Sequence, residues 1–165
     1  MANDSVITTL NNIIETLKDG QEGFQQAAEG VQDSSLKTIF YEYSQQRAQF
    51  VGELQGLVRE LGGDAETSSS LAGALHRGWI NIKSAVTGRD DAAILNECER
   101  GEDIAKNVYK DALAADLPSN VSSVIQRQAT AVQQAHDKVR SLRDVANNTS
   151  SSTATTGSTS GGGGF

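Results

Sequence analysis

The sequence predicts an all-α protein that folds as an antiparallel four-helix bundle, and three observations support this fold class. The chain has 165 residues with a single proline, and its many Ala, Leu, Glu and Gln residues favour helices over a turn-rich β fold. Four long segments repeat apolar residues at spacings of three and four, as one face of a helix requires. Short connections join these segments in pairs, so each pair can pack antiparallel.

The first two helices are predicted from about Asp4 to Val31 and from about Ser34 to Leu61. Asp33 precedes the second helix, where its short side chain can accept hydrogen bonds from free backbone amides. Gly62 and Gly63 follow this helix, and glycine tolerates the left-handed conformation that ends many helices. The apolar stripes are Leu10, Ile14, Leu17, Phe24, Ala28 and Val31 in the first helix, and Leu36, Ile39, Phe40, Tyr43, Phe50, Leu54, Leu57 and Leu61 in the second.

The third and fourth helices are predicted to begin near Asp90 and near Pro118. Asp90 and Asp91 can cap a first turn and suit the positive end of a helix dipole, and proline suits a first-turn position. Cys98 lies in the stripe of the third helix, so we interpret it as a buried structural thiol rather than a nucleophile. The stripes are Ile94, Cys98, Ala105, Val108 and Ala112 in the third helix, and Val121, Val124, Ile125, Val132, Ala135, Val139 and Leu142 in the fourth.

The lengths of the connections predict the topology. A few residues around 30–33 and 114–117 join the helices of each pair, whereas a long crossover, Gly62 to Arg89, joins the second helix to the third. The crossover can run the full height of a bundle. It is itself predicted to be partly helical, because apolar residues recur in it at spacings of three or four. Two antiparallel hairpins joined by one long crossover are the ferritin-like arrangement of a four-helix bundle.

The composition changes near residue 145. Residues 145–165 carry no charge, consist mostly of Ser, Thr, Asn, Ala and Gly, and end in four glycines and Phe165. Such a segment buries too little apolar surface to offset a chain entropy of about 1–2 kcal/mol per residue. We therefore predict a bundle over residues 1–144 and a disordered tail over residues 145–165.

Charge and composition exclude several classes of protein. The chain has 21 acidic and 14 basic residues and a net charge of -7, which argues against a nucleic-acid binder. No apolar stretch is long enough for membrane insertion, and the first residues do not resemble a secretory signal, so a cytoplasmic location is expected. The single cysteine excludes an internal disulfide framework and a multi-cysteine metal site.

Polar side chains interrupt the apolar stripe of each predicted helix. They are Gln21, Gln46, Glu102 and Gln128, and we expect them to point inward at comparable depth as a hydrogen-bonded polar layer. Buried amides and carboxylates need partners, so Arg47 is expected to pair with Glu102. Polar residues of this kind fix helix register at some cost in stability.

A metal site is the alternative interpretation of these polar residues. Dinuclear carboxylate sites in such bundles use one Glu on each of two helices and Glu-x-x-His on each of the other two. Here Gln45 replaces the histidine of one motif and Gln133 replaces the glutamate of the other, so an intact di-iron site is not expected. The ligands predicted for a degenerate iron or manganese site are Glu22, Glu99, Glu102 and His136.

The crossover around Trp79 has two interpretations. In the first, Leu71, Leu75 and Trp79 cover the flank of the bundle while the neighbouring polar residues stay in solvent. In the second, His76, Arg77 and Trp79 form a surface for a partner or a second copy, because Trp and Arg are enriched in interface hot spots.

Several short strings in the chain resemble those of a known family. They are LKDGQEGF at 17–24, QRAQF at 46–50, ELGG at 60–63, LHRGW at 75–79, ERGED at 99–103 and AHDKV at 135–139. Over about Asn3 to Asp144 the chain resembles a bacterial domain-of-unknown-function family of four-helix-bundle proteins in the ferritin-like superfamily. The resemblance implies a ferritin-like bundle in the bacterial cytoplasm, and it implies a metal only by analogy.

These observations predict a non-enzymatic protein that acts through self-association or through a protein partner, with a role in stress physiology suggested by the resemblance alone. No cofactor is expected under this interpretation. The alternative is a ferritin-like protein that binds iron or manganese at the degenerate carboxylate and histidine site. Bound iron with open coordination positions would then permit oxidation chemistry.

Overall fold

The computed structural model describes the backbone of residues 2–64 and 78–162 and the side chains of residues 3–64 and 78–148. Within these ranges the chain forms five α-helices and no strand, which confirms the predicted all-helical class. The helices are α1 (Ala2–Gly30), α2 (Ser34–Glu60), α3 (Ile82–Thr87), α4 (Asp91–Leu113) and α5 (Ser119–Gly162).

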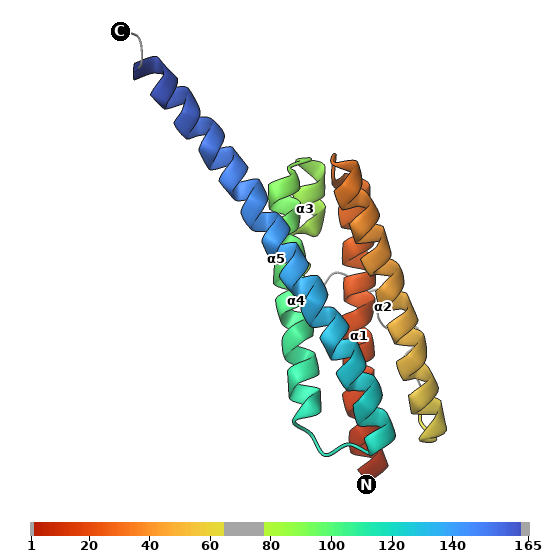
Figure 1. Ribbon diagram of the computed structural model, residues 1–165. Coiled ribbons are helices and arrows are strands. Elements are labelled where there is room, and N and C mark those ends of the chain that lie inside the picture. The colour runs from red at the N-terminus through yellow and green to blue at the C-terminus, as the bar shows by residue number, and fades with distance from the viewer. Residues whose placement is uncertain (1, 65–77, 163–165) are drawn as a thin grey trace.

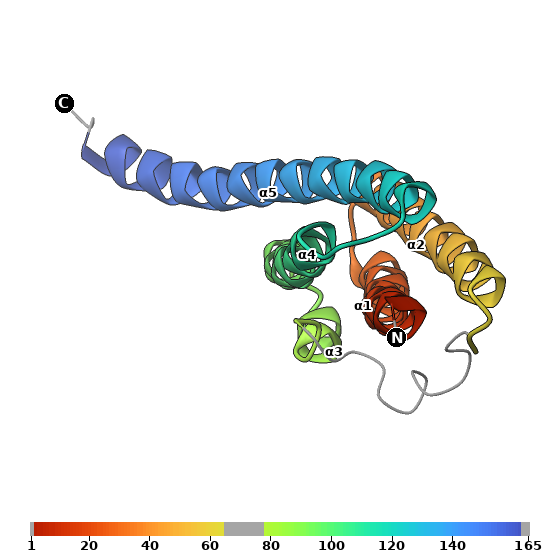
Figure 2. The same ribbon diagram turned by 90° about the horizontal axis from the view of Figure 1, so that it is seen from below.

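The four long helices pack side by side; α2 runs opposite to α1 and α5 runs opposite to α4, whereas α2 and α4 run in the same direction (Figure 1). α1 packs along α2, α4 packs along α5, and α1 also packs against α4. The short helix α3 lies against α1 and α4, while α2 and α5 meet only over a short stretch. Seen from below, α5 crosses over the other long helices at an angle instead of running parallel to them (Figure 2).

The helix ends follow the local signals in the sequence. Asp33 caps α2, because its carboxylate accepts hydrogen bonds from the backbone amides of Ser35 and Leu36, and Asp90 caps α4 in the same way. Gly62 follows α2 with a φ of +83°, the left-handed conformation in which glycine is not strained. α5 begins one residue after Pro118, close to the predicted start.

The apolar side chains form two separate clusters along the helices. The first cluster joins the start of α1 to the end of α2, the end of α4 and the start of α5, and consists of Val6, Leu10, Ile13, Ile14, Leu17, Phe50, Val51, Leu54, Val58, Ala105, Tyr109, Ala112, Val121, Ile125 and Val132. The second cluster lies at the other end and consists of Phe24, Ala27, Ala28, Val31, Leu36, Phe40, Trp79, Ile82, Ile94, Leu95, Cys98 and Val139. Buried polar residues occupy the level between the two clusters.

Trp79 belongs to the core of the protein. Its indole is only 1% exposed and lies between α1 and α4, where a Cβ atom added to Gly23 or Gly101 would come within 2.3 and 2.1 Å of the ring. These two glycines therefore form a slot for the indole, which also meets the ring of Phe24 edge-on at 5.0 Å. The burial of Trp79 fits a residue that covers the flank of the bundle and does not fit an exposed hot spot. The other residues of the two interpretations, Leu71, Leu75, His76 and Arg77, lie outside the described residues.

The last part of α5 differs from the tail predicted over residues 145–165. Ala146 packs, partly buried, against the second cluster, and the backbone then continues as helix to Gly162 and projects away from the other helices (Figure 1). Residues 145–156 contain neither proline nor glycine, so no residue of this stretch forces the helix to end. The division of the chain into a bundle over 1–144 and a disordered tail stays a prediction.

Candidate metal centre

A buried ion pair crosses the level between the two apolar clusters. Arg47 of α2 and Glu102 of α4 are 1% and 0% exposed, and the guanidinium donates to both carboxylate oxygens, at 2.5 Å from Nη1 to Oε1 and 2.8 Å from Nη2 to Oε2. The guanidinium also lies over the Phe24 ring, 5.3 Å from its centroid. Burial alone would lower the pKa of Arg47, but the charge and hydrogen bonds of Glu102 raise it. The pairing expected from the sequence is therefore present.

The predicted polar layer is present only in part. Glu102 and Gln128 are both 0% exposed, whereas Gln21 and Gln46 are half-buried at the edge. Gln128 also lies at a different level from Glu102, because it packs among the residues of the first cluster. There it accepts a hydrogen bond from the Tyr109 hydroxyl at 2.8 Å and donates one to Glu53 at 2.9 Å. Gln46 accepts a hydrogen bond from Arg47 Nε at 3.4 Å and so adjoins the Arg47–Glu102 pair, while Gln128 belongs to a separate polar group with Tyr109 and Glu53.

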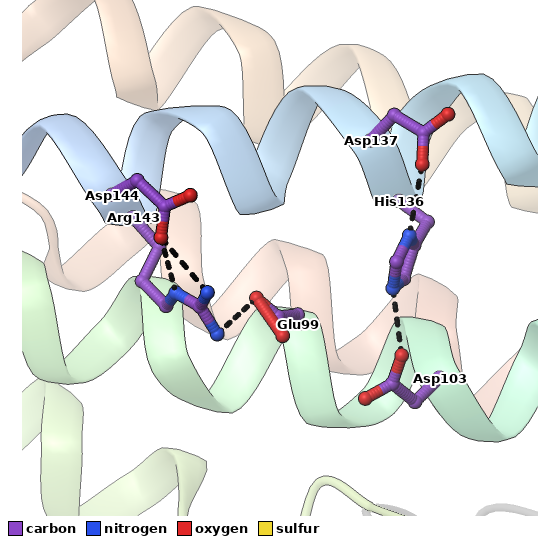
Figure 3. Close-up of polar contacts among 6 residues, drawn as sticks. All are labelled: Glu99, Asp103, His136, Asp137, Arg143 and Asp144. Atoms are coloured by element: carbon purple, nitrogen blue, oxygen red, sulfur yellow. Dashed lines mark hydrogen bonds and ion pairs between the residues drawn. The ribbon is translucent and has the colours of Figure 1, made fainter.

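The candidate metal centre lies between α4 and α5 and is formed by Glu99, Asp103 and His136. Each of these residues offers one ligand atom, and the three atoms all lie within 4.8 Å of one another. His136 Nε2 is 2.6 Å from Asp103 Oδ1, and Figure 3 shows the ring standing between α5 and the Asp103 carboxylate. Glu99 and Asp103 are four residues apart, which places both on one face of α4.

The second ring nitrogen of His136 is also held by a carboxylate. Nδ1 lies 3.2 Å from Asp137 Oδ1, and Gln133 donates to the same oxygen at 2.9 Å. The contact with His136 and then the bond from Gln133 lower the pKa of Asp137. The imidazole is 3% exposed, so its orientation is set by these contacts and by the surrounding helices. A histidine whose far nitrogen is fixed by a carboxylate is the usual arrangement of a metal-binding imidazole.

Glu99 has a second neighbour in Arg143 of α5. The guanidinium Nη1 forms an ion pair with Glu99 Oε2, and Asp144 accepts from the same guanidinium at 2.8 Å from Nη2 and 3.3 Å from Nε (Figure 3). The Glu99 carboxylate is thus placed between the candidate centre on one side and a fixed positive charge on the other.

Two of the four ligands predicted from the sequence belong to this group. Glu99 and His136 lie in it, but Glu102 is turned toward Arg47, and the Glu22 carboxylate accepts a hydrogen bond from Gln26 on its own helix at 3.1 Å. Asp103 was missed, although its spacing of four from Glu99 is the signal that places two carboxylates together. Glu102 and Asp103 are adjacent, so their side chains leave α4 about 100° apart.

Cys98 is 0% exposed and packs in the second cluster. Burial raises the pKa of its thiol, and the negative charges of Glu102 and Glu97 raise it further. A thiol in this environment stays protonated and is a poor nucleophile, in agreement with the structural role predicted for it.

The donor set of the candidate centre fits a divalent ion after small side-chain movements. Two ligand atoms bound at about 2.1 Å and at right angles lie about 3 Å apart. The 2.6 Å contact between His136 and Asp103 therefore has to open slightly, while Glu99 has to close in. The Asp103 side chain is 50% exposed and can make this adjustment. A metal binds the unprotonated nitrogen of an imidazole, so Nε2 would have to be free of a proton when the ion is bound.

Fold and site define an all-helical protein with a carboxylate–imidazole cluster between two of its helices. Residues 5–115 match the family described as a domain of unknown function, DUF2383, and the chain belongs to this family. The matched residues include Glu99 and Asp103, whereas His136 and Arg143 lie beyond them. A comparison with curated proteins finds no match. None of the described helices combines the length and apolar character needed to cross a membrane.

Proposed function

We propose that this protein binds one divalent transition-metal ion through Glu99, Asp103 and His136. The observation that carries the proposal is the nearly buried imidazole of His136, whose Nδ1 faces Asp137 while its Nε2 faces a carboxylate of the candidate centre. Two carboxylates and one neutral imidazole would neutralise a divalent charge. The arrangement is mononuclear, and it supports the degenerate site and not a di-iron centre.

The donor types support manganese or iron as the ion. Imidazole is a common ligand of iron and zinc, carboxylates suit manganese and magnesium, and a mixed set with open positions is typical of Mn(II) or Fe(II). Three protein ligands leave coordination positions for water or a small molecule. With iron, these open positions would allow oxidation chemistry; with manganese or zinc, the ion would act as a Lewis acid.

Titration of Mn(II) into protein purified without a chelating tag tests the proposal. We expect one ion per chain, and thermal unfolding should shift upward because an ion at 100 times its dissociation constant stabilises the fold by about 2.7 kcal/mol. Asp103→Asn should weaken binding at least tenfold, and its half-exposed position makes it compatible with folding. The matched control is Asp111→Asn, an exposed carboxylate on the same helix. Absence of binding, or equal binding by Asp103→Asn, would refute the site.

Association through α5 is a second candidate function, in line with the role in self-association or partner binding that the sequence predicts. Its support is the course of α5, which leaves the other helices with Val145 61% exposed. Light scattering of the full chain and of a chain ending at residue 148 tests it. A dimer that persists in the shorter chain, or a monomer in both, counts against association through the end of α5.

The ferritin-like four-helix bundle is proposed as the fold. The order of the long helices and the long connection between α2 and α4 support it, while the short contact between α2 and α5 is a departure from a regular bundle. Bacterial origin, a cytoplasmic location and a role in stress rest on the resemblance alone.

A further inference from the structure

Glu99 is shared between the candidate metal centre and the side chain of Arg143. Its carboxylate is 13% exposed, and Arg143 Nη1 contacts Oε2 directly. We propose that the Arg143 guanidinium competes with the metal for Glu99, so that it occupies this carboxylate when the ion is absent and releases it when the ion binds. This inference rests on the proposed function, because it concerns the regulation of the same site.

Charge is the first reason for competition. A divalent ion bound to Glu99 would lie beside the guanidinium, and two positive charges at such short range repel each other in a partly buried site. Glu99 also has to move toward Asp103 and His136 to join the coordination sphere, since the three ligand atoms are spread over as much as 4.8 Å. That movement draws the carboxylate away from Arg143.

Asp144 makes the release of Glu99 feasible. It already accepts two hydrogen bonds from the guanidinium, from Nε and Nη2, and these can remain when the contact to Glu99 is lost. The Arg143 side chain is 25% exposed, so water can replace the missing partner. Arg143 is therefore not left as an isolated buried charge in the metal-bound protein.

The competition between Arg143 and the metal for Glu99 also connects the metal centre to the end of α5. Arg143 lies between Leu142 and Ala146, the last described residues of α5 that pack against the second cluster, and its pair with Glu99 ties this turn to α4. Loss of the pair should loosen the turn. Metal binding and the loosening of this turn are two coupled equilibria, and such coupling is reciprocal. A change that loosens the turn should therefore raise the affinity of the centre for the metal.

Calorimetric titration of Mn(II) into the full chain tests the competition. Arg143→Gln should bind Mn(II) about tenfold more tightly than the wild type, within the usual range of a coupling between two binding equilibria. Arg140→Gln is the matched control, because Arg140 is exposed, lies three residues earlier on the same helix, and gives the same change in net charge. Its affinity should stay within about twofold of the wild type, since a solvated charge is screened.

Hydrogen exchange provides the second measurement. Amides of residues 140–148 should exchange faster in the wild type when Mn(II) is bound, and they should show no such response in Arg143→Gln. Equal or weaker Mn(II) binding by Arg143→Gln overturns the inference, as does slower exchange of these amides in the Mn(II)-bound wild type. In either case the proposed function stands as long as the wild type binds Mn(II) and Asp103→Asn binds it at least tenfold more weakly. Failure of the wild type and of Arg143→Gln to bind Mn(II) removes both.

Discussion

Removal of one member of the buried Arg47–Glu102 pair should strongly destabilise the fold. Glu102→Gln keeps the shape of the side chain but leaves the guanidinium of Arg47, which is 1% exposed, without a counter-charge. Breaking a buried ion pair in this way costs about 3–5 kcal/mol, a large part of the roughly 5–15 kcal/mol that stabilises a typical domain. Urea denaturation followed by circular dichroism should show a midpoint lower by about 2 M, since small domains have slopes of about 1–3 kcal/mol per M.

A double variant separates the cost of an unpaired charge from the value of the pair itself. Arg47→Met combined with Glu102→Leu replaces both ions with apolar groups, and such replacements are often neutral or stabilising, so most of the lost free energy should return. Glu42→Gln makes the same chemical change at an exposed position of α2 and should alter the free energy of unfolding by less than about 0.5 kcal/mol. A loss below about 1 kcal/mol in Glu102→Gln would contradict the argument.

Three further predictions concern other parts of the protein. Burial pushes the pKa of Glu53 upward, but hydrogen bonds from Arg127 and Gln128 outweigh this and hold it below its ordinary value of 4.5. Glu53 therefore contributes to the free energy of unfolding above pH 4.5, and this contribution is lost as the pH falls through the pKa of Glu53 in the folded state. Arg127→Gln should flatten the acidic part of a plot of unfolding free energy against pH. An unchanged plot would refute this prediction. Gly101→Ala should lower the free energy of unfolding, measured by urea denaturation, by about 1–3 kcal/mol, because the added methyl group fills the slot of the indole. Gly52 has open space around it, so Gly52→Ala should be neutral or stabilise the fold by up to about 1 kcal/mol. Equal effects of the two substitutions would show that the slot is not tight. A chain ending at residue 148 should keep the unfolding free energy of the full chain to within about 0.5 kcal/mol, and a larger loss would mean that the end of α5 supports the fold.

Much of the fold could be predicted because its determinants are local. The caps at Asp33 and Asp90 depend on residues within three positions, and the apolar stripes depend on the period of the helix. The pairing of Arg47 with Glu102 was also within reach, since a buried carboxylate requires a partner and Arg47 is the residue next to Gln46, which interrupts the stripe of the second helix. The predictions of these features hold even when the assumed rotation of each helix about its axis is slightly wrong.

To predict the ligands of the candidate metal centre, one has to know how α4 is rotated about its own axis, and the sequence does not specify this rotation. Glu102 and Asp103 are neighbours, and a rotation of about 100° decides which of them faces His136. The packing of α4 against both α1 and α5 settles this choice in favour of Asp103. Gln128 is buried as deeply as Glu102, as predicted, but it lies among residues of the first cluster, where it bonds to Tyr109 and to the Phe50 carbonyl.

The position of Trp79 could be predicted only as a general tendency to cover apolar surface. Its slot is formed by Gly23 and Gly101, on two helices far away in the chain, and a missing side chain leaves no apolar pattern to detect. Close approach of this kind becomes visible only when the helices are placed side by side.

The slot gives the protein an intrinsic optical reporter. Trp79 is the sole tryptophan of the chain, so all indole emission arises from one point where the crossover, α1 and α4 meet. Undocking of the crossover would bring this ring into water and move its emission to longer wavelength without any added dye. Fluorescence can therefore follow the attachment of this segment separately from the helix content seen by circular dichroism.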